Sequence, residues 1–137
     1  MKNFDNFGGI FKLRQLSEIK LVSLPISFIL LIDEHWISIF VNETCVEIMD
    51  SAGFMRLAVK RKELRSFLCP IIRFKTLKVS TQLQTDGSKT CGLFAVSFLY
   101  VRSFTDLTLC DFCNFFTTKF SANEKRIHKL FEAIVTD

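Results

Sequence analysis

The sequence predicts an α+β fold in which a helix that begins at Cys91 packs on a mostly antiparallel sheet. Short segments with period-two patterning fill much of the first half of the chain, and helical patterning fills the second half. The 137 residues are 49% hydrophobic and include 16 phenylalanines, which is enough apolar material for one buried core. No repeat or low-complexity linker divides the chain, so we expect a single domain over residues 1–137.

The strand-like segments begin with the apolar run 27–33, which contains β-branched residues and is expected to form a buried strand. Residues 35–41 alternate in period two, and the turn-forming residues 42–44 follow. The segment 45–50 resumes the β-type pattern. Two such strands joined by a short turn predict a β-hairpin.

The next part of the chain reads as a helix over 57–69 that ends before Pro70, and then as a strand over 71–79. A polar loop over 80–90 follows, with Gly87 as its pivot.

Three helices are expected after this loop. The first begins at Cys91, and the other two fit residues 108–119 and 122–135. Ser121 and Glu124 have the spacing of a capping box at the start of the last helix.

The composition excludes several classes of protein. The longest strongly apolar stretch, residues 24–32, contains Pro25 and is far shorter than the roughly 20 residues of a membrane-spanning helix. The first nine residues have no apolar signal-peptide core, so we expect an intracellular protein without a membrane partner. The net charge of +4 is modest, and the basic clusters at 60–65 and 124–129 are expected to be solvated helix faces. Contact with DNA remains an open alternative for them.

The cysteines are five in number, which favours free thiols in a reducing compartment. Cys110 and Cys113 have the spacing of redox and zinc sites. Because no second pair of ligands lies nearby, we interpret them as core residues and expect no metal or other cofactor. Cys45 and Cys69 are also expected to be packing residues.

Cys91 has two interpretations. A free cysteine at the start of an apolar helix can be a buried space-filler, or a nucleophile whose thiolate is favoured by the helix N-terminus. A nucleophile needs a nearby base and a group that orients that base. The chain has two histidines, of which His128 lies among charges on a late helix and His35 lies just before a strand. His35 is therefore the candidate base.

The predicted hairpin supplies an acid for this histidine. If Asn42 and Glu43 form the turn, His35 lies opposite Asp50, and if the turn takes in Thr44 as well, the two lie one residue out of register. Side chains opposite each other on one face of a sheet are about 5 Å apart. Asp50 is thus a better orienting acid than Asp33, which would need a bend in the chain to reach the ring.

Three segments of the sequence resemble the adenovirus-type cysteine proteases, a group that includes enzymes of Polinton/Maverick-like elements. They are "HW" at 35–36, "MDSAGF" at 49–54 and "QLQTDGSKTCGLFAVSFL" at 82–99, in which Gln84 lies seven residues before Cys91. The opening "GGIFKLRQL" at 8–16 is also similar to the start of these domains, so the resemblance covers residues 8–99. The SUMO-specific proteases, which belong to the same papain-like superfamily, share the fold and the order of these residues.

The resemblance implies Cys91 as nucleophile, His35 as base and Asp50 as orienting acid. It implies Gln84 as the side-chain donor to an oxyanion hole that also uses the backbone N–H of Cys91. Trp36 and Gly92 are expected to line the substrate site, where glycine leaves room for the substrate backbone. Gln82 is the rival donor, and Asp86 is the rival acid. Arg73 stands where the adenoviral enzymes have a cysteine for an activating peptide, so that cofactor is not expected.

The predicted activity is that of a thiol endopeptidase that cleaves viral or mobile-element precursor proteins at Gly-containing motifs during capsid maturation. The expected locations are the host nucleus or the virion for a viral protein, and the cytoplasm or nucleus otherwise, and the expected state is a monomer. Self-cleavage after Gly9 is a further hypothesis, against the alternative that Gly8 and Gly9 form a flexible start to the domain. The alternative functions are removal of ubiquitin-like or SUMO-type modifiers and a catalytically inactive interaction domain.

Overall fold

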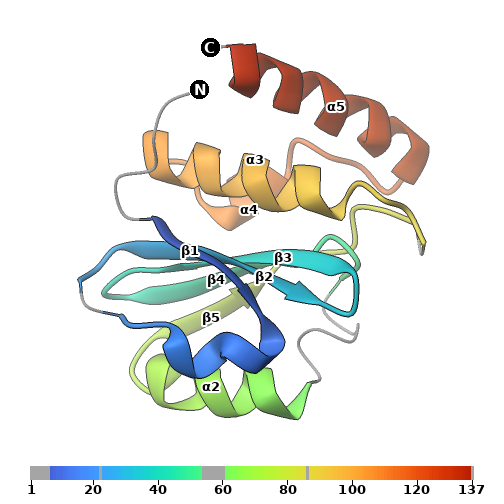
Figure 1. The fold of residues 1–137 in the computed structure, drawn as a ribbon. Helices are drawn as coiled ribbons and strands as arrows, with labels where there is room; N and C mark the ends of the chain where they lie inside the picture. The colour runs from blue at the N-terminus through green and yellow to red at the C-terminus, as the bar shows by residue number, and fades with distance from the viewer. Residues whose placement is uncertain (1–6, 22, 54–60, 86, 137) are drawn as a thin grey trace.

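The computed structural model describes residues 7–21, 23–53, 61–85 and 87–136, which form a layered α+β domain (Figure 1). In this part of the chain a five-stranded sheet has the order β1-β2-β3-β4-β5. Its strands are β1 (Phe7–Lys12), β2 (Ile26–Ile32), β3 (His35–Val41), β4 (Cys45–Met49) and β5 (Thr76–Val79). The helices are the 3-10 helix η1 (Leu13–Glu18) and the α-helices α2 (Lys62–Ile72), α3 (Cys91–Phe104), α4 (Leu109–Cys113) and α5 (Phe120–Thr136).

The predicted fold class is confirmed, but the sheet is mixed. β3 pairs antiparallel with β2 and with β4, whereas β1 pairs parallel with β2 and β5 pairs parallel with β4. Each outer pair has helical structure between its strands in the chain, η1 for the first and α2 for the second. A crossover of this kind returns the chain in the same direction, which produces parallel neighbours.

Both faces of the sheet are covered, with α2 and η1 on one face and α3 on the other, and α5 lies outside α3 (Figure 1). Phe28, Leu30 and Ile39 point to the core under α2, and the alternate residues Ile29 and Phe40 point to the core under α3. Strands that are buried on both faces read as continuous apolar runs. This explains why the segment 27–33 showed no alternation.

The β3–β4 hairpin is present, but both predicted registers were wrong. Ser38 pairs with Met49, and Val41 pairs with Val46, so the turn consists of Glu43 and Thr44. Asn42 belongs to the last rung of the ladder, where its N–H donates to the carbonyl of Cys45 at 3.0 Å. Its side-chain Oδ1 accepts the N–H of Thr44 and of Cys45, which closes the turn one residue later than expected.

The helix predicted over 57–69 is observed as α2, and its position differs from the prediction at the C-terminal end. Pro70 lies inside α2 and the helix continues to Ile72, so the strand that follows is limited to Thr76–Val79. Ile71 and Ile72 pack against the core under α2, and this burial outweighs the loss of the Pro70 N–H. Residues 57–60 of the predicted helix lie outside the described residues.

The two late helices also differ from their predicted bounds. α4 covers only Leu109–Cys113, because Thr108 caps its start and the segment after it forms turns. α5 begins at Phe120, and Ser121 and Glu124 do not form the predicted capping box. The Glu124 carboxylate instead accepts hydrogen bonds from two residues of the loop before α3.

The packing prediction for four cysteines was wrong for two of them. Cys69 and Cys110 are exposed, whereas Cys45 and Cys113 are partly buried. Gly8 and Gly9 lie within β1, where its register with β2 shifts between Phe7 and Ile10, so they are part of a strand and not a flexible start to the domain. None of the helices in the described ranges has the length and apolar character that crossing a bilayer requires.

Candidate active site

His35 is the first residue of β3 and follows a tight turn. Asp33 and Glu34 adopt positive φ angles of 48° and 64°, and Ile32 on one side of the turn pairs with His35 on the other. Positive φ at both central residues is the geometry of the two-residue hairpins that match the twist of a sheet. The turn places the imidazole at the end of the sheet next to the N-terminus of α3.

Asp50 directly follows β4 and reaches His35 diagonally. Its Oδ1 lies 2.7 Å from Nε2 of His35, and its side chain is fully buried. The Asp50 backbone is fixed by Ser80, whose hydroxyl accepts the Asp50 N–H at 2.8 Å and donates to the Asp50 carbonyl at 2.7 Å. The N–H of Ala52 donates to the same Oδ1 at 3.1 Å. Asp50 is therefore held rigidly against the ring.

Cys91 is the first residue of α3, and its thiol is surrounded by donors. The N–H of Trp36 donates to Sγ at 3.4 Å, and the N–H of Gly92 and the His35 ring also hydrogen bond to the thiol. Since Nε2 of His35 is bonded to Asp50, Nδ1 is the ring nitrogen left for Cys91. Hydrogen bonds thus connect the acid to the imidazole and the imidazole to the thiol. This is the arrangement of a cysteine nucleophile with an oriented base.

The electrostatics of this group favour a charged pair. Burial by itself would lower the pKa of His35, but its hydrogen bonds to Asp50 and Cys91 outweigh burial and raise the pKa to about 9. Burial by itself would raise the pKa of Cys91, but the hydrogen bonds from His35 and from the Trp36 N–H outweigh it and lower that pKa. An imidazolium next to a thiolate is the reactive form of such a cysteine at neutral pH.

Gln84 lines the same cleft as Cys91, and its amide orientation is fixed. The Ser51 hydroxyl donates to Oε1, and Nε2 donates to the carbonyl of Ser88 at 3.1 Å. Because a carbonyl can only accept, the nitrogen must face Ser88, and its second N–H is left for a ligand. Gln82, the rival donor, uses its Nε2 on the carbonyl of Gln84 at 3.0 Å.

A cleft of about 620 Å³ joins these groups and is lined by Glu34, His35, Trp36, Ala52, Gln84, Gly87, Ser88, Lys89 and Cys91. A Cβ at position 92 would lie 3.5 Å from Cδ1 of Trp36, so glycine keeps the space between the α3 N-terminus and the indole open. The side chain of Thr90, the residue before α3, does not cap the helix. The N–H groups of the first turn, including that of Cys91, have no acceptor within the helix.

The structure thus brings together Cys91, His35, Asp50 and Gln84, with Trp36 and Gly92 beside them. Of the rivals, Asp33 pairs with Arg61 on the surface, and His128 is exposed on α5. Asp86 lies outside the described residues. Sequence reasoning missed the supporting roles of Ser51, Ser80, Ser88 and Glu124. An isolated serine carries no pattern that distinguishes it from a surface residue, and the spacing of Glu124 indicated a capping box instead.

The described residues contain no cluster of three or more histidine, cysteine or acidic side chains that could hold a metal ion. The cleft contains a thiol whose pKa is lowered, an adjacent imidazole whose pKa is raised, and two N–H donors, from Gln84 and from the Cys91 backbone. This arrangement is suited to acyl transfer, in which a carbonyl carbon bound next to the thiolate develops charge on its oxygen.

No family model matches the sequence, and no curated protein matches it. Similarity is found among solved structures. The ASFV pS273R protease superposes with a TM-score of 0.50 at 21% identity, over 80% of this chain and 44% of the protease chain. The central domain of the uncharacterized Lpg1148 protein from Legionella pneumophila gives 0.53 at 12% identity, over 99% of this chain and 92% of that domain. The chain therefore shares its fold with these proteins, and it spans less than half of the pS273R protease.

Proposed function

We propose that this protein is a cysteine endopeptidase, with Cys91 as nucleophile, His35 as acid and base, and Asp50 as the orienting acid. The observation that carries the proposal is the continuous hydrogen-bonded line from Asp50 through His35 to Cys91, at the mouth of a cleft. Hydrogen bonds and charge outweigh burial and shift the pKa values of the base and the thiol in opposite directions, as nucleophilic catalysis requires. The similarity of the fold to a viral cysteine protease supports this reaction class.

The reaction follows from the geometry. The Cys91 thiolate attacks the scissile carbonyl carbon, a C–S bond forms, and the carbonyl oxygen takes the electron pair. Gln84 Nε2 and the Cys91 N–H donate to that oxygen. The leaving nitrogen takes the proton from Nδ1 of His35 as the C–N bond breaks, which leaves a thioester. Water then attacks the thioester and gives its proton to His35, and the acid product and the thiolate are released.

The proposed substrates are precursor proteins of a virus or mobile element, cleaved at Gly-containing sequences during capsid maturation. Trp36 over Gly92 supports a preference for small residues, because the indole limits the space next to the thiol. The test compares the turnover of Gly-Gly-containing precursor peptides with the turnover of a ubiquitin-like fusion protein. Cleavage of the peptides alone supports the proposal, cleavage of the fusion alone supports a deconjugating peptidase, and no turnover of either supports an inactive interaction domain.

A thiol-labelling experiment tests the site without any substrate. Iodoacetamide at pH 6–7 should modify Cys91 far faster than Cys69 and Cys110, although those two are exposed and Cys91 is buried. The reason is that the lowered pKa of Cys91 lets it react as a thiolate. Mass spectrometry of the modified protein identifies the labelled residue. Faster labelling of Cys69 or Cys110 would contradict the assignment of the nucleophile.

A further inference from the structure

We infer that Glu124 of α5 is a positioning residue that sets the distance between the two oxyanion donors. This inference rests on the proposed function. Gln84 lies within the loop that joins β5 to α3, and Cys91 directly follows this loop. The described residues of the loop form no helix or strand. Contacts from outside the loop must therefore fix its shape.

Glu124 supplies such contacts at the end of the loop that leads to Cys91. Its Oε1 accepts a hydrogen bond from the Ser88 hydroxyl and another from Thr90 Oγ1 at 3.3 Å, and these two hydroxyls lie 3.0 Å apart. One carboxylate oxygen thus holds two residues that precede the nucleophile. Hydrogen bonds to a charged acceptor are stronger than those between neutral groups, which suits this anchoring role.

The same residue acts on Gln84 through Ser88. The Ser88 carbonyl is the acceptor that orients Nε2 of Gln84, while the Ser88 side chain is bound to Glu124. A shift of Ser88 would therefore rotate the Gln84 amide away from the thiol. Losses of about 10²-fold are typical when a group is displaced by 1 Å in an active site.

Asn123, the residue before Glu124 in α5, holds the part of the loop that precedes Gln84. Asn123 is fully buried and donates to the carbonyl of Leu83 at 3.0 Å and to that of Thr117 at 2.7 Å. Neighbouring residues of one helix therefore anchor the loop on both sides of Gln84. The N-terminal part of α5 therefore fixes the position of this loop.

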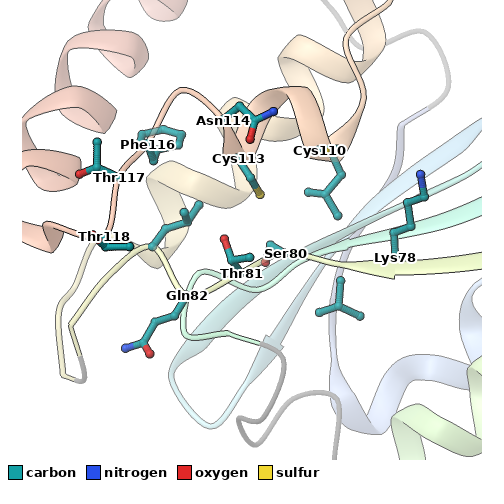
Figure 2. A pocket seen from close by; sticks show the side chains of 13 residues that line it. Lys78, Ser80, Thr81, Gln82, Cys110, Cys113, Asn114, Phe116, Thr117 and Thr118 are labelled. Atoms are coloured by element: carbon teal, nitrogen blue, oxygen red, sulfur yellow. The ribbon is translucent and has the colours of Figure 1, made fainter.

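The start of the loop borders a cavity. A cavity of about 610 Å³ lies behind residues 80–83, between them and the segment from α4 to residue 118 (Figure 2). Thr81 and Cys113 both line this cavity, and Thr81 hydrogen bonds to the Cys113 thiol. Apart from this contact the region is open, so the loop also depends on the hydrogen bonds from α5.

The test compares Glu124→Ala, Glu124→Gln and the matched control Glu132→Ala, which removes an exposed glutamate from the same helix. Glu124→Ala should lower kcat by about 10- to 100-fold and leave KM little changed. Glu124→Gln keeps an acceptor oxygen for both hydroxyls and should recover most of the rate, and Glu132→Ala should match the wild type. In a Gln84→Ala background, Glu124→Ala should cost almost nothing more, because it acts through that donor.

Hydrogen exchange separates this inference from the proposed function. Amides of the peptide 83–90 should exchange faster in Glu124→Ala, while those of β2 and β3 keep their protection. Faster exchange in a protein that cleaves no substrate would overturn the proposed function alone. Two results would overturn the positioning role. One is an unchanged kcat in Glu124→Ala, and the other is a double variant with Gln84→Ala whose loss in kcat equals the product of the two single losses.

Discussion

At the residue scale, the site is defined by which hydrogen-bond donors surround each reacting atom. Cys91 has three hydrogen-bond donors around its sulfur, and Asp50 has one oxygen committed to His35 and Ala52. The second oxygen, Oδ2, is buried and has no hydrogen-bond partner in the described structure. Both bonds are accepted by Oδ1, so the role that these contacts support for Asp50 is to fix the orientation of the imidazole ring.

The oxyanion assignment gives the prediction at this scale. Gln84→Ala should lower kcat on the order of 10²-fold with little change in KM, because an oxyanion donor acts only in the transition state. Peptide hydrolysis under steady-state conditions measures the effect. The rate of Cys91 alkylation should be unchanged, since Gln84 makes no contact with the thiol–imidazole pair that sets that rate.

Gln82→Ala is the matched control for this prediction. Gln82 lies two residues away, and its amide donates to the Gln84 backbone at 3.0 Å, not into the cleft. Its removal should leave kcat within a few-fold of the wild type. An equal loss in both variants, or a loss in Gln82→Ala alone, would show that the donor has been assigned to the wrong residue.

These residues also show what the sequence could predict. Cys91, His35 and Asp50 could be proposed as a group because the chain has two histidines and the spacings of these residues resemble a known pattern. The proximity of His35 and Asp50 survived a register error because Asp50 lies beyond the end of β4 and reaches the ring diagonally. Ser51 and Ser88 were not identifiable, because their role depends on a loop conformation that only tertiary contacts define.

At the element scale, a buried ion pair holds α3, the helix that begins at Cys91, against the sheet. Arg102, near the C-terminal end of α3, donates from Nε to Oε1 of Glu47 on β4 at 2.6 Å. The other carboxylate oxygen accepts the N–H of Leu109 at the start of α4, and the guanidinium lies 4.3 Å from the centre of the Phe40 ring. Glu47 thus links β4, α3 and α4.

Glu47→Ala should therefore lower the free energy of unfolding by about 3 kcal/mol, because it leaves a largely buried guanidinium and a backbone N–H unpaired. Urea denaturation followed by circular dichroism measures the change. Glu43→Ala, an exposed glutamate in the turn of the same hairpin, should change stability by less than about 0.5 kcal/mol. The double variant Glu47→Ala with Arg102→Ala should lose less than the sum of the two single losses. A loss below about 1 kcal/mol in Glu47→Ala would contradict the role given to this pair.

Element boundaries were the least predictable feature. Pro70 and the residues near Ser121 are local signals that normally end or start helices, and tertiary packing overrode both. Ile71 and Ile72 extend α2 because they pack against the core. Glu124 does not form the predicted capping box, because its carboxylate accepts hydrogen bonds from the hydroxyls of Ser88 and Thr90 in the loop before α3. The helix beginning at Cys91 was predictable because its own apolar residues, such as Phe94 and Phe98, form the core that holds it.

At the scale of the whole molecule, the layers concentrate the site at one end of the sheet. The start of β3, the residues after β4 and the N-terminus of α3 meet there, and α5 lies outside α3 (Figure 1). Groups from three elements must be in place before the thiol–imidazole pair can form. The ionisation of this pair is for that reason coupled to the folding of the entire domain.

The pH dependence of stability is the prediction at this scale. The pKa of His35 rises from 6.5 to about 9 on folding, so its contribution is fully present below pH 6.5 and is lost as the pH rises toward 9. The pKa of Cys91 falls from 9.0, so its contribution is present above pH 9 and is lost as the pH falls through the folded value. The folded protein holds one extra proton on His35 and lacks one on Cys91, so between pH 6.5 and 9 the two effects oppose each other.

Wild-type stability should accordingly change little over this range. Cys91→Ala removes the opposing contribution but keeps the Asp50 hydrogen bond to His35, so its free energy of unfolding should decline as the pH rises from 6.5. Urea denaturation of both proteins at pH 6, 7, 8 and 9 measures the two profiles, and Cys69→Ala, which removes an exposed thiol, should follow the wild type. A flat profile in Cys91→Ala would show that Asp50 alone does not raise the pKa of His35, and that the charged pair depends on the thiolate.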